Sequence, residues 1–158
     1  MNENSDIFSE LLFLRNALES TPKSWFPSGT AFRACLTKFP TGCCGDTALL
    51  AAMHLFIKFG IECKYVSARG LGDNQQLSHA WIEYNGYIID LSADQFNSKG
   101  FSLERVIFSK SSEFHGLFSK KEVKELNISA LGTSPIGKSY SLIKNHFGHD
   151  LKALLHKK

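Results

Sequence analysis

Three residues whose types combine in thiol catalysis occur in order along the chain: Cys44, His79 and Asp90. Cys44 begins an apolar segment directly after Gly42-Cys43, His79 lies in a strand-like stretch, and Asp90 closely follows an Asn-Gly pair. A cysteine at a helix start, with a histidine base that a carboxylate orients, is the arrangement of an activated nucleophile. The pattern therefore predicts covalent acyl chemistry.

The surroundings of Cys44 favour a reactive thiol. The N-terminus of a helix stabilises a thiolate through its unpaired N–H groups and its dipole. Gly42 and Gly45 leave room for a substrate carbonyl to approach the backbone, and the N–H of Cys44 is a candidate oxyanion donor. Asp46, a negative charge in the first turn, opposes the thiolate slightly.

A predicted β-hairpin brings the histidine and the aspartate together. Asn85-Gly86 is a strong signal for a two-residue hairpin loop, and such a loop pairs Tyr84 with Tyr87, Ile82 with Ile89, and Trp81 with Asp90. Since side chains alternate along a strand, one face carries His79, Trp81, Glu83 and Asp90. Asp90 is then a diagonal neighbour of His79, roughly 7–8 Å away between backbones, and its carboxylate can accept an imidazole N–H. Asp94 has the same parity and is the rival orienter.

The elements that must position these residues predict an α+β fold. Hydrophobic periodicity and end signals indicate helices over 6–20, 31–36 and 44–59, the last ended by Gly60. Strands are expected over 61–68, 78–84 and 87–91, a short helix or strand over 102–108, and helices over 120–126 and 141–155. Helices followed by strands favour an antiparallel sheet packed on the buried helix 44–59.

Length and composition predict one domain spanning residues 1–158, because 158 residues with 43% hydrophobic content make a single sizeable core. The net charge of +3 is spread along the chain, which argues against nucleic-acid binding. The N-terminus lacks the features of a signal peptide, and the longest apolar stretch is too short for a membrane span. We therefore expect a cytoplasmic protein with no membrane or nucleic-acid partner, while export by a signal-less route stays open.

The four cysteines, Cys35, Cys43, Cys44 and Cys63, have spacing that suits neither disulfides nor a metal. Adjacent cysteines rarely bridge, and the chain has no CxxC or HxxxH pair to supply half of a zinc site. We expect reduced thiols, no metal and no cofactor.

Residues 41–95 resemble the core of the transglutaminase-like superfamily, within the papain-like cysteine hydrolases. The resemblance rests on Gly-x-Cys followed by an alanine four residues later, a Gly-Ile pair closing the helix, His-Ala-Trp-x-Glu, and an aspartate; here these are Gly42, Cys44, Ala48, Gly60-Ile61, His79 to Glu83, and Asp90. These offsets select Cys44 over Cys43 as the nucleophile. The sequence departs from the family pattern at Glu62-Cys63-Lys64 and at Leu91-Ser92.

The resemblance implies a papain-like fold and a cysteine hydrolase or acyltransferase acting on a protein or peptide amide. Members of this superfamily include proteases, deamidases, crosslinking enzymes, peptide-maturation proteases and inactive binding modules, so these alternatives stay open. A short chain favours hydrolysis or glutamine deamidation over crosslinking. Candidate substrate or oxyanion residues are Trp25, Gln76 (or its neighbour Gln75) and Trp81, although Trp81 is also explained as a core aromatic.

Overall fold

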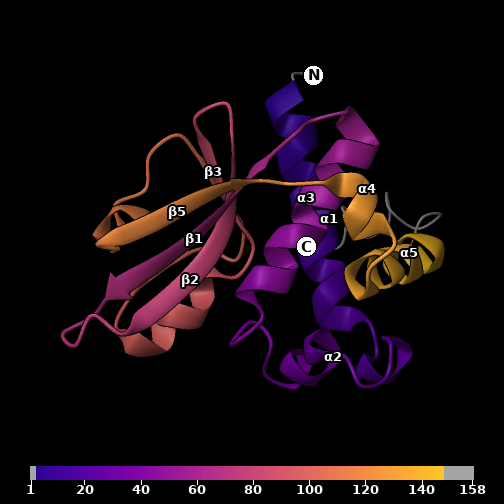
Figure 1. The fold of residues 1–158 in the computed structure, drawn as a ribbon, viewed down its shortest axis with the longest axis horizontal. Helices are drawn as coiled ribbons and strands as arrows, with labels where there is room; N and C mark the ends of the chain where they lie inside the picture. The colour runs from indigo at the N-terminus through magenta and orange to yellow at the C-terminus, as the bar shows by residue number, and fades with distance from the viewer. Residues whose placement is uncertain (1–2, 148–158) are drawn as a thin grey trace.

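The computed structural model describes residues 3–147 and shows an α+β fold with a five-stranded antiparallel sheet. The strands are β1 (Lys64–Leu71), β2 (Leu77–Tyr84), β3 (Tyr87–Asp90), β4 (Ile107–Ser109) and β5 (Lys120–Glu125), in the order β4-β3-β2-β1-β5. The α-helices are α1 (Glu3–Ser20), α2 (Ala31–Cys35), α3 (Cys44–Phe59), α4 (Ile128–Gly132) and α5 (Pro135–Phe147). The sheet lies to one side of the molecule and these helices to the other (Figure 1).

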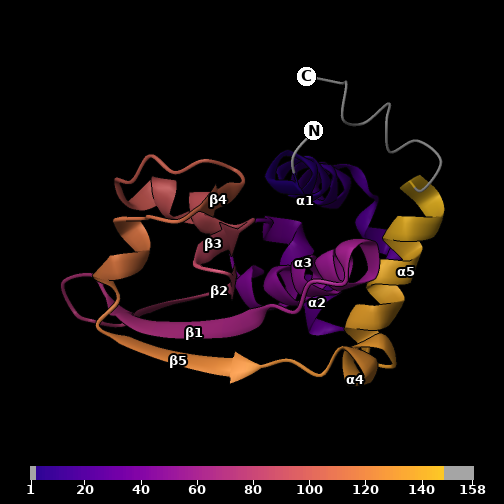
Figure 2. The same ribbon diagram turned by 90° about the horizontal axis from the view of Figure 1, so that it is seen from above.

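Short 3₁₀ helices occupy several connections: η1 (Lys23–Trp25), η2 (Leu36–Lys38), η3 (Ala93–Lys99) and η4 (Phe114–Leu117). The last two lie in the chain between β3 and β5, and they contribute aromatic side chains to the core. In Figure 2 the segment between β3 and β5 lies in the upper part of the view, whereas β1 and β5 lie at the bottom.

Helix α3 has the predicted bounds and begins at Cys44. Its apolar side chains are buried over most of its length, as the nearly continuous hydrophobic sequence predicts. Gly60 ends the helix at a φ of 69°, a left-handed conformation that glycine adopts without steric cost, and its N–H bonds the carbonyls of Leu55 and Phe56. The helix packs mainly on β2, so the start of the helix is held beside the strand that carries His79.

The predicted hairpin is confirmed in its turn and its register. Asn85 and Gly86 both have positive φ, 50° and 79°, as a two-residue hairpin turn requires. The strand pairs include Tyr84 with Tyr87 and Ile82 with Ile89. Because the side-chain period of a strand is two, this register fixes which face each hairpin residue joins.

Buried side chains form two apolar clusters, one on each face of the sheet. The first includes Ile82 and Ile89 together with the buried faces of α1, α3 and α5. The second joins residues of β1 and β2 to the segment after β3, and consists of Val66, Ala68, Leu71, Trp81, Ala93, Phe96, Phe114 and Phe118. Trp81 lies in the second cluster, so this segment covers the face of the hairpin on which His79 was expected.

The prediction of a helix over 120–126 is wrong, because Lys120–Glu125 forms β5. Its Lys and Glu residues favour helix locally, but the segment pairs along its whole length with β1 in antiparallel register, from Lys64 with Glu125 to Arg69 with Lys120. The pairing satisfies the backbone, and charged side chains suit an exposed edge strand. Tertiary pairing therefore overrides local propensity here.

Other boundaries shift by a few residues. The strand expected over 61–68 begins at Lys64, the first helix begins at Glu3, and the segment 102–108 holds only the start of β4. The C-terminal helix begins at Pro135 rather than 141, and proline suits a first helical position because its missing N–H has no intrahelical partner there. The part of that prediction beyond residue 147 lies outside the described residues.

Within residues 3–147, none of the helices combines the length and apolar character needed to cross a bilayer.

Candidate active site

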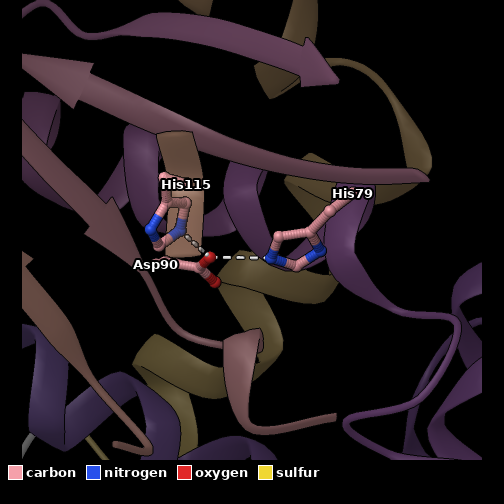
Figure 3. A group of neighbouring side chains, drawn as sticks. All are labelled: His79, Asp90 and His115. Carbon is pink, nitrogen blue, oxygen red and sulfur yellow. Dashed lines mark hydrogen bonds and ion pairs between the residues drawn. The ribbon is translucent and has the colours of Figure 1, made fainter. Parts of the chain in front are cut away.

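His79 and Asp90 form a direct, fully buried hydrogen bond. Nε2 of His79 lies 2.7 Å from Oδ2 of Asp90, and both side chains are at most 1% exposed. The strand β2 supplies the histidine and the end of β3 supplies the carboxylate, as the hairpin register predicts. Figure 3 shows the imidazole pointing one nitrogen at the carboxylate and the other away from it.

Asp90 also bonds a second histidine, His115 in η4. Nε2 of His115 lies 2.7 Å from the same Oδ2 that binds His79 (Figure 3). The other carboxylate oxygen, Oδ1, accepts the backbone N–H of Ser92 at 2.9 Å. The Ser112 side chain bonds Nδ1 of His115, so the second histidine is held from both sides. Asp90 is thus fully engaged and has a fixed orientation.

These contacts determine where the hydrogens lie. An ionised carboxylate oxygen only accepts, so Nε2 of both His79 and His115 must donate to Asp90. Nδ1 of His79 is therefore the nitrogen left to exchange a proton. The neighbouring Cys44 thiol contributes to the raised pKa of His79, and Nδ1 is the ring nitrogen that does not face Asp90.

The electrostatics favour a protonated His79 at neutral pH. Burial alone would lower the pKa of His79, but the charge and hydrogen bond of Asp90, followed by the interaction with Cys44, raise it to about 9. Burial alone would raise the pKa of Asp90, but the charge of His79 and the hydrogen bonds from His115 and His79 hold it well below its usual range. The contacts of the buried pair thus favour an imidazolium facing a carboxylate.

Gln95 joins the three segments of the site. Its Nε2 donates to the carbonyl of Ser92 at 3.0 Å and lies 3.4 Å from Nδ1 of His79. Its Oε1 accepts the backbone N–H of Gly42 at 3.4 Å, two residues before Cys44. Gln95 and Cys44 are both partly exposed, whereas His79 is buried.

Aromatic rings enclose His79 on the side away from solvent. Its ring centroid lies 5.1 Å from that of Phe96, 5.8 Å from Trp81, 6.2 Å from Phe114 and 6.3 Å from Phe118. Apolar walls exclude water, and charge interactions are stronger where water is excluded. The enclosure therefore strengthens the contact between His79 and Asp90.

Tyr65 of β1 lies beside the start of α3. A Cβ placed on Gly45 would lie 3.1 Å from the Tyr65 hydroxyl, so the hydroxyl closely approaches the residue after Cys44. Burial, then the charges of Cys44 and Asp46, raise the pKa of Tyr65. Burial also raises the pKa of Asp46.

The rival orienter, Asp94, is engaged elsewhere. Its two carboxylate oxygens accept from the guanidinium of Arg15 at 2.7 and 2.8 Å. Arg15 also donates to the carbonyls of Leu91 and Arg105, so it holds the chain on both sides of η3 against α1. Asp90, rather than Asp94, is the carboxylate placed against His79.

The three tentative substrate residues have different surroundings, and of these Trp81 lies against His79, with ring centroids 5.8 Å apart. Trp25 is 44% exposed and packs edge-on against His146 of α5, with ring centroids 4.4 Å apart. Gln76 is exposed in the turn before β2. Trp81 is fully buried and its indole N–H donates to Glu83 at 2.9 Å, which fits the interpretation as a core aromatic.

Sequence reasoning missed His115 and Gln95. His115 lies 25 positions beyond Asp90, in a region of weak hydrophobic pattern. Gln95 lies only five positions after Asp90, and this closeness on the chain is the one signal that could have pointed to it. No local pattern points to His115.

His79, Asp90 and His115 are also the side chains within residues 3–147 whose types and closeness could hold a metal ion, with ligand atoms within 4.8 Å of one another. A tetrahedral zinc ion with bonds of about 2.0–2.2 Å holds its ligand atoms roughly 3.3 Å apart. The observed Nε2 to Oδ2 distances of 2.7 Å are those of direct hydrogen bonds. The three side chains would therefore have to move apart before an ion could bind between them.

Comparison of the chain with protein-family models, with curated proteins and with solved structures finds no match. The fold and the site geometry are therefore the basis for any functional conclusion.

Proposed function

We propose that this protein is a cysteine-dependent amide hydrolase, a protease or a glutamine deamidase, with a papain-like, transglutaminase-like core. Cys44 is the nucleophile, His79 the acid and base, and Asp90 the residue that orients the imidazole. The observation that carries the proposal is the position of His79. It bonds buried Asp90 through Nε2, and it lies beside Gln95, whose amide contacts Gly42 just before the thiol at a helix start. Burying a charged histidine costs free energy. A catalytic role therefore explains the placement of His79 better than a purely structural role does.

The first step forms a thioester. The Cys44 thiolate attacks the carbonyl carbon of the amide, and the C–N bond breaks as Nδ1 of His79 gives its proton to the leaving nitrogen. Asp90 stays ionised and keeps Nε2 protonated, so only Nδ1 takes part in the transfer. The leaving group is an amine for a protease and ammonia for a deamidase.

The second step returns the free enzyme. Nδ1 of His79, now neutral, takes a proton from water as the water oxygen attacks the thioester, and the Cys44 thiolate leaves. The product is a carboxylic acid. An amine in place of water would give crosslinking.

Gln95 and the backbone N–H of Cys44 are the proposed oxyanion donors. The first N–H groups of a helix have no intrahelical acceptor, and Cys44 is the first residue of α3. The Gln95 amide lies beside Nδ1 of His79 and contacts Gly42 before the nucleophile. Gln95 thus replaces Trp25, Gln76 and Trp81 as the preferred side-chain donor.

The proposed substrate is a protein or peptide in the cytoplasm, and no cofactor takes part. A peptidase that matures a ribosomally made peptide is the second reading within the same chemistry. It differs from a general protease in its substrate and partners and uses the same residues.

Iodoacetamide labelling across pH tests the activated thiol. Intact-mass kinetics would compare the wild type with His79→Gln, and Cys43→Ala would serve as the matched control because it removes the neighbouring sulfur. We expect Cys44 of the wild type to react faster than a free thiol near neutral pH, and His79→Gln to abolish the advantage. Reaction no faster than a free thiol, with no effect of His79→Gln, would disprove the proposal.

Turnover separates an enzyme from a binding module that keeps the fold. Incubation with an unfolded, glutamine-rich protein would be followed by ammonia release and by the appearance of new N-termini, with Cys44→Ala as the inactive reference. A fast-reacting Cys44 without either product would favour the noncatalytic reading over the enzyme.

A further inference from the structure

A second pair of sulfur atoms lies beside the candidate nucleophile and belongs to a different chemistry. Sγ of Cys43 lies 2.7 Å from Sγ of Cys35, and both residues are free thiols. Cys35 is the last residue of α2 and Cys43 is the residue that precedes α3, so the contact joins the ends of two helices. From these positions we propose that Cys35 and Cys43 are a redox site that closes to a disulfide by exchange with a small-molecule disulfide such as oxidised glutathione.

The geometry selects this pair over the other possible pairs. A disulfide has an S–S length of about 2.05 Å, so the two sulfurs need to approach by less than about 1 Å. Cys43 and Cys44 are adjacent in sequence, where closure of a disulfide is strained. Cys63 is buried directly before β1, and within residues 3–147 it contacts no other sulfur.

The two thiols differ in access, which sets the order of events. Cys35 is partly exposed, whereas Cys43 is only 1% exposed. Burial raises the pKa of both thiols, but the hydrogen bond that Cys43 donates to the Cys35 sulfur opposes the rise in the pKa of Cys35 and adds to that of Cys43. Cys35 is therefore the sulfur that meets a dissolved disulfide first.

The two protein thiols and one oxidised glutathione are the only reactants that the exchange needs. The Cys35 thiolate attacks one sulfur of oxidised glutathione, forming a mixed disulfide and releasing one glutathione thiolate. Cys43 then loses its proton and attacks the Cys35 sulfur, releasing the second glutathione thiolate. Two protein thiols are oxidised and one glutathione disulfide is reduced to two thiols.

Closure would tie the loop 36–42 across its ends and would leave Cys44 free. A cross-link of so short a loop removes conformational freedom chiefly from the unfolded chain. We expect oxidation of the wild type to raise the melting temperature by roughly 5 °C, reversibly with dithiothreitol.

Mass mapping of the oxidised protein tests the site directly. Trypsin cleaves after Lys38, between the two cysteines, so the disulfide would link residues 34–38 to the peptide that carries Cys43. In Cys44→Ala, which removes the thiol that would form its own glutathione adduct, we expect a mass lower by two hydrogens and this linked pair before reduction. The result in this variant assigns the bond to Cys43 and holds whether or not Cys44 is catalytic.

Two variants complete the test. Cys43→Ala should retain only a mixed glutathione adduct, while the control Cys63→Ala should form the linked pair at the wild-type rate. A link between 34–38 and Cys44 in the wild type, or a glutathione adduct with no link, would overturn the proposal.

Discussion

The charge of His79 makes the stability of the folded protein depend on pH in a definite direction. The pKa of this histidine is about 9 in the folded state, where Asp90 outweighs the effect of burial, against an ordinary value of 6.5. Because the folded state holds the proton more tightly, His79 stabilises the fold fully below about pH 6.5. That contribution is lost as the pH rises through about 9.

The magnitude follows from the shift. A shift of about 2.5 units at about 1.4 kcal/mol per unit corresponds to about 3 kcal/mol of unfolding free energy. Between the two pKa values the contribution should fall by up to about 1.4 kcal/mol for each pH unit.

Urea unfolding from about pH 6.5 to about pH 9 measures the effect when Cys44→Ala is compared with Cys44→Ala/His79→Gln. Removing Cys44 takes the nucleophilic thiol out of the titration. Burial raises the pKa of the Cys63 thiol to about 12, and that of Cys43 is raised as well, but both groups are present in both proteins and cancel. We expect the difference in unfolding free energy to shrink as the pH rises.

A difference that stays constant or grows with pH would refute the reasoning, because His79 would then be neutral when folded. Imidazole ¹⁵N chemical shifts of the wild type supply an independent reading if the double variant folds poorly. They should show Nε2 protonated throughout and Nδ1 losing its proton near pH 9.

Three further substitutions separate catalysis from structure. Gln95→Ala should lower turnover roughly 10²–10³-fold, as loss of an oxyanion donor does, while the rate of Cys44 alkylation stays within a few-fold of the wild type; an equal fall in both would make Gln95 a structural residue. Asp94→Ala leaves the buried guanidinium of Arg15 with Glu19 as its remaining carboxylate partner and should cost about 1.5–3 kcal/mol in urea unfolding, with alkylation of the folded protein retained. Tyr140→Phe removes one hydrogen bond to His54 between α5 and α3 and should cost about 1 kcal/mol with no change in turnover; lost turnover would contradict the separation of that network from the site.

The parts of the fold that sequence predicted well have local signals. The bounds of α3 follow from an apolar run that ends in glycine, and the hairpin follows from Asn85-Gly86 and strand alternation. Both depend on residues within a few positions of one another, so no long-range contact is needed to specify them.

The segment after β3 was predicted poorly for the opposite reason. The strand β5 forms because β1 offers it a partner, although its own residues favour helix. The 3₁₀ helices η3 and η4 have no strong period, and they take their places by packing Phe96, Phe114 and Phe118 on the second face of the sheet.

The amino-acid sequence alone determines that a cysteine begins the central helix and that His79 and Asp90 share one face of a hairpin, because helix ends and strand register are local properties. The tertiary structure decides which carboxylate meets which cation, since Arg15 of α1 binds Asp94 and leaves Asp90 to His79. It also decides that His115 binds Asp90 and that Gln95 contacts both His79 and Gly42. These contacts join residues far apart on the chain, and only the packing of α1, α3 and η4 against the sheet brings them within bonding distance.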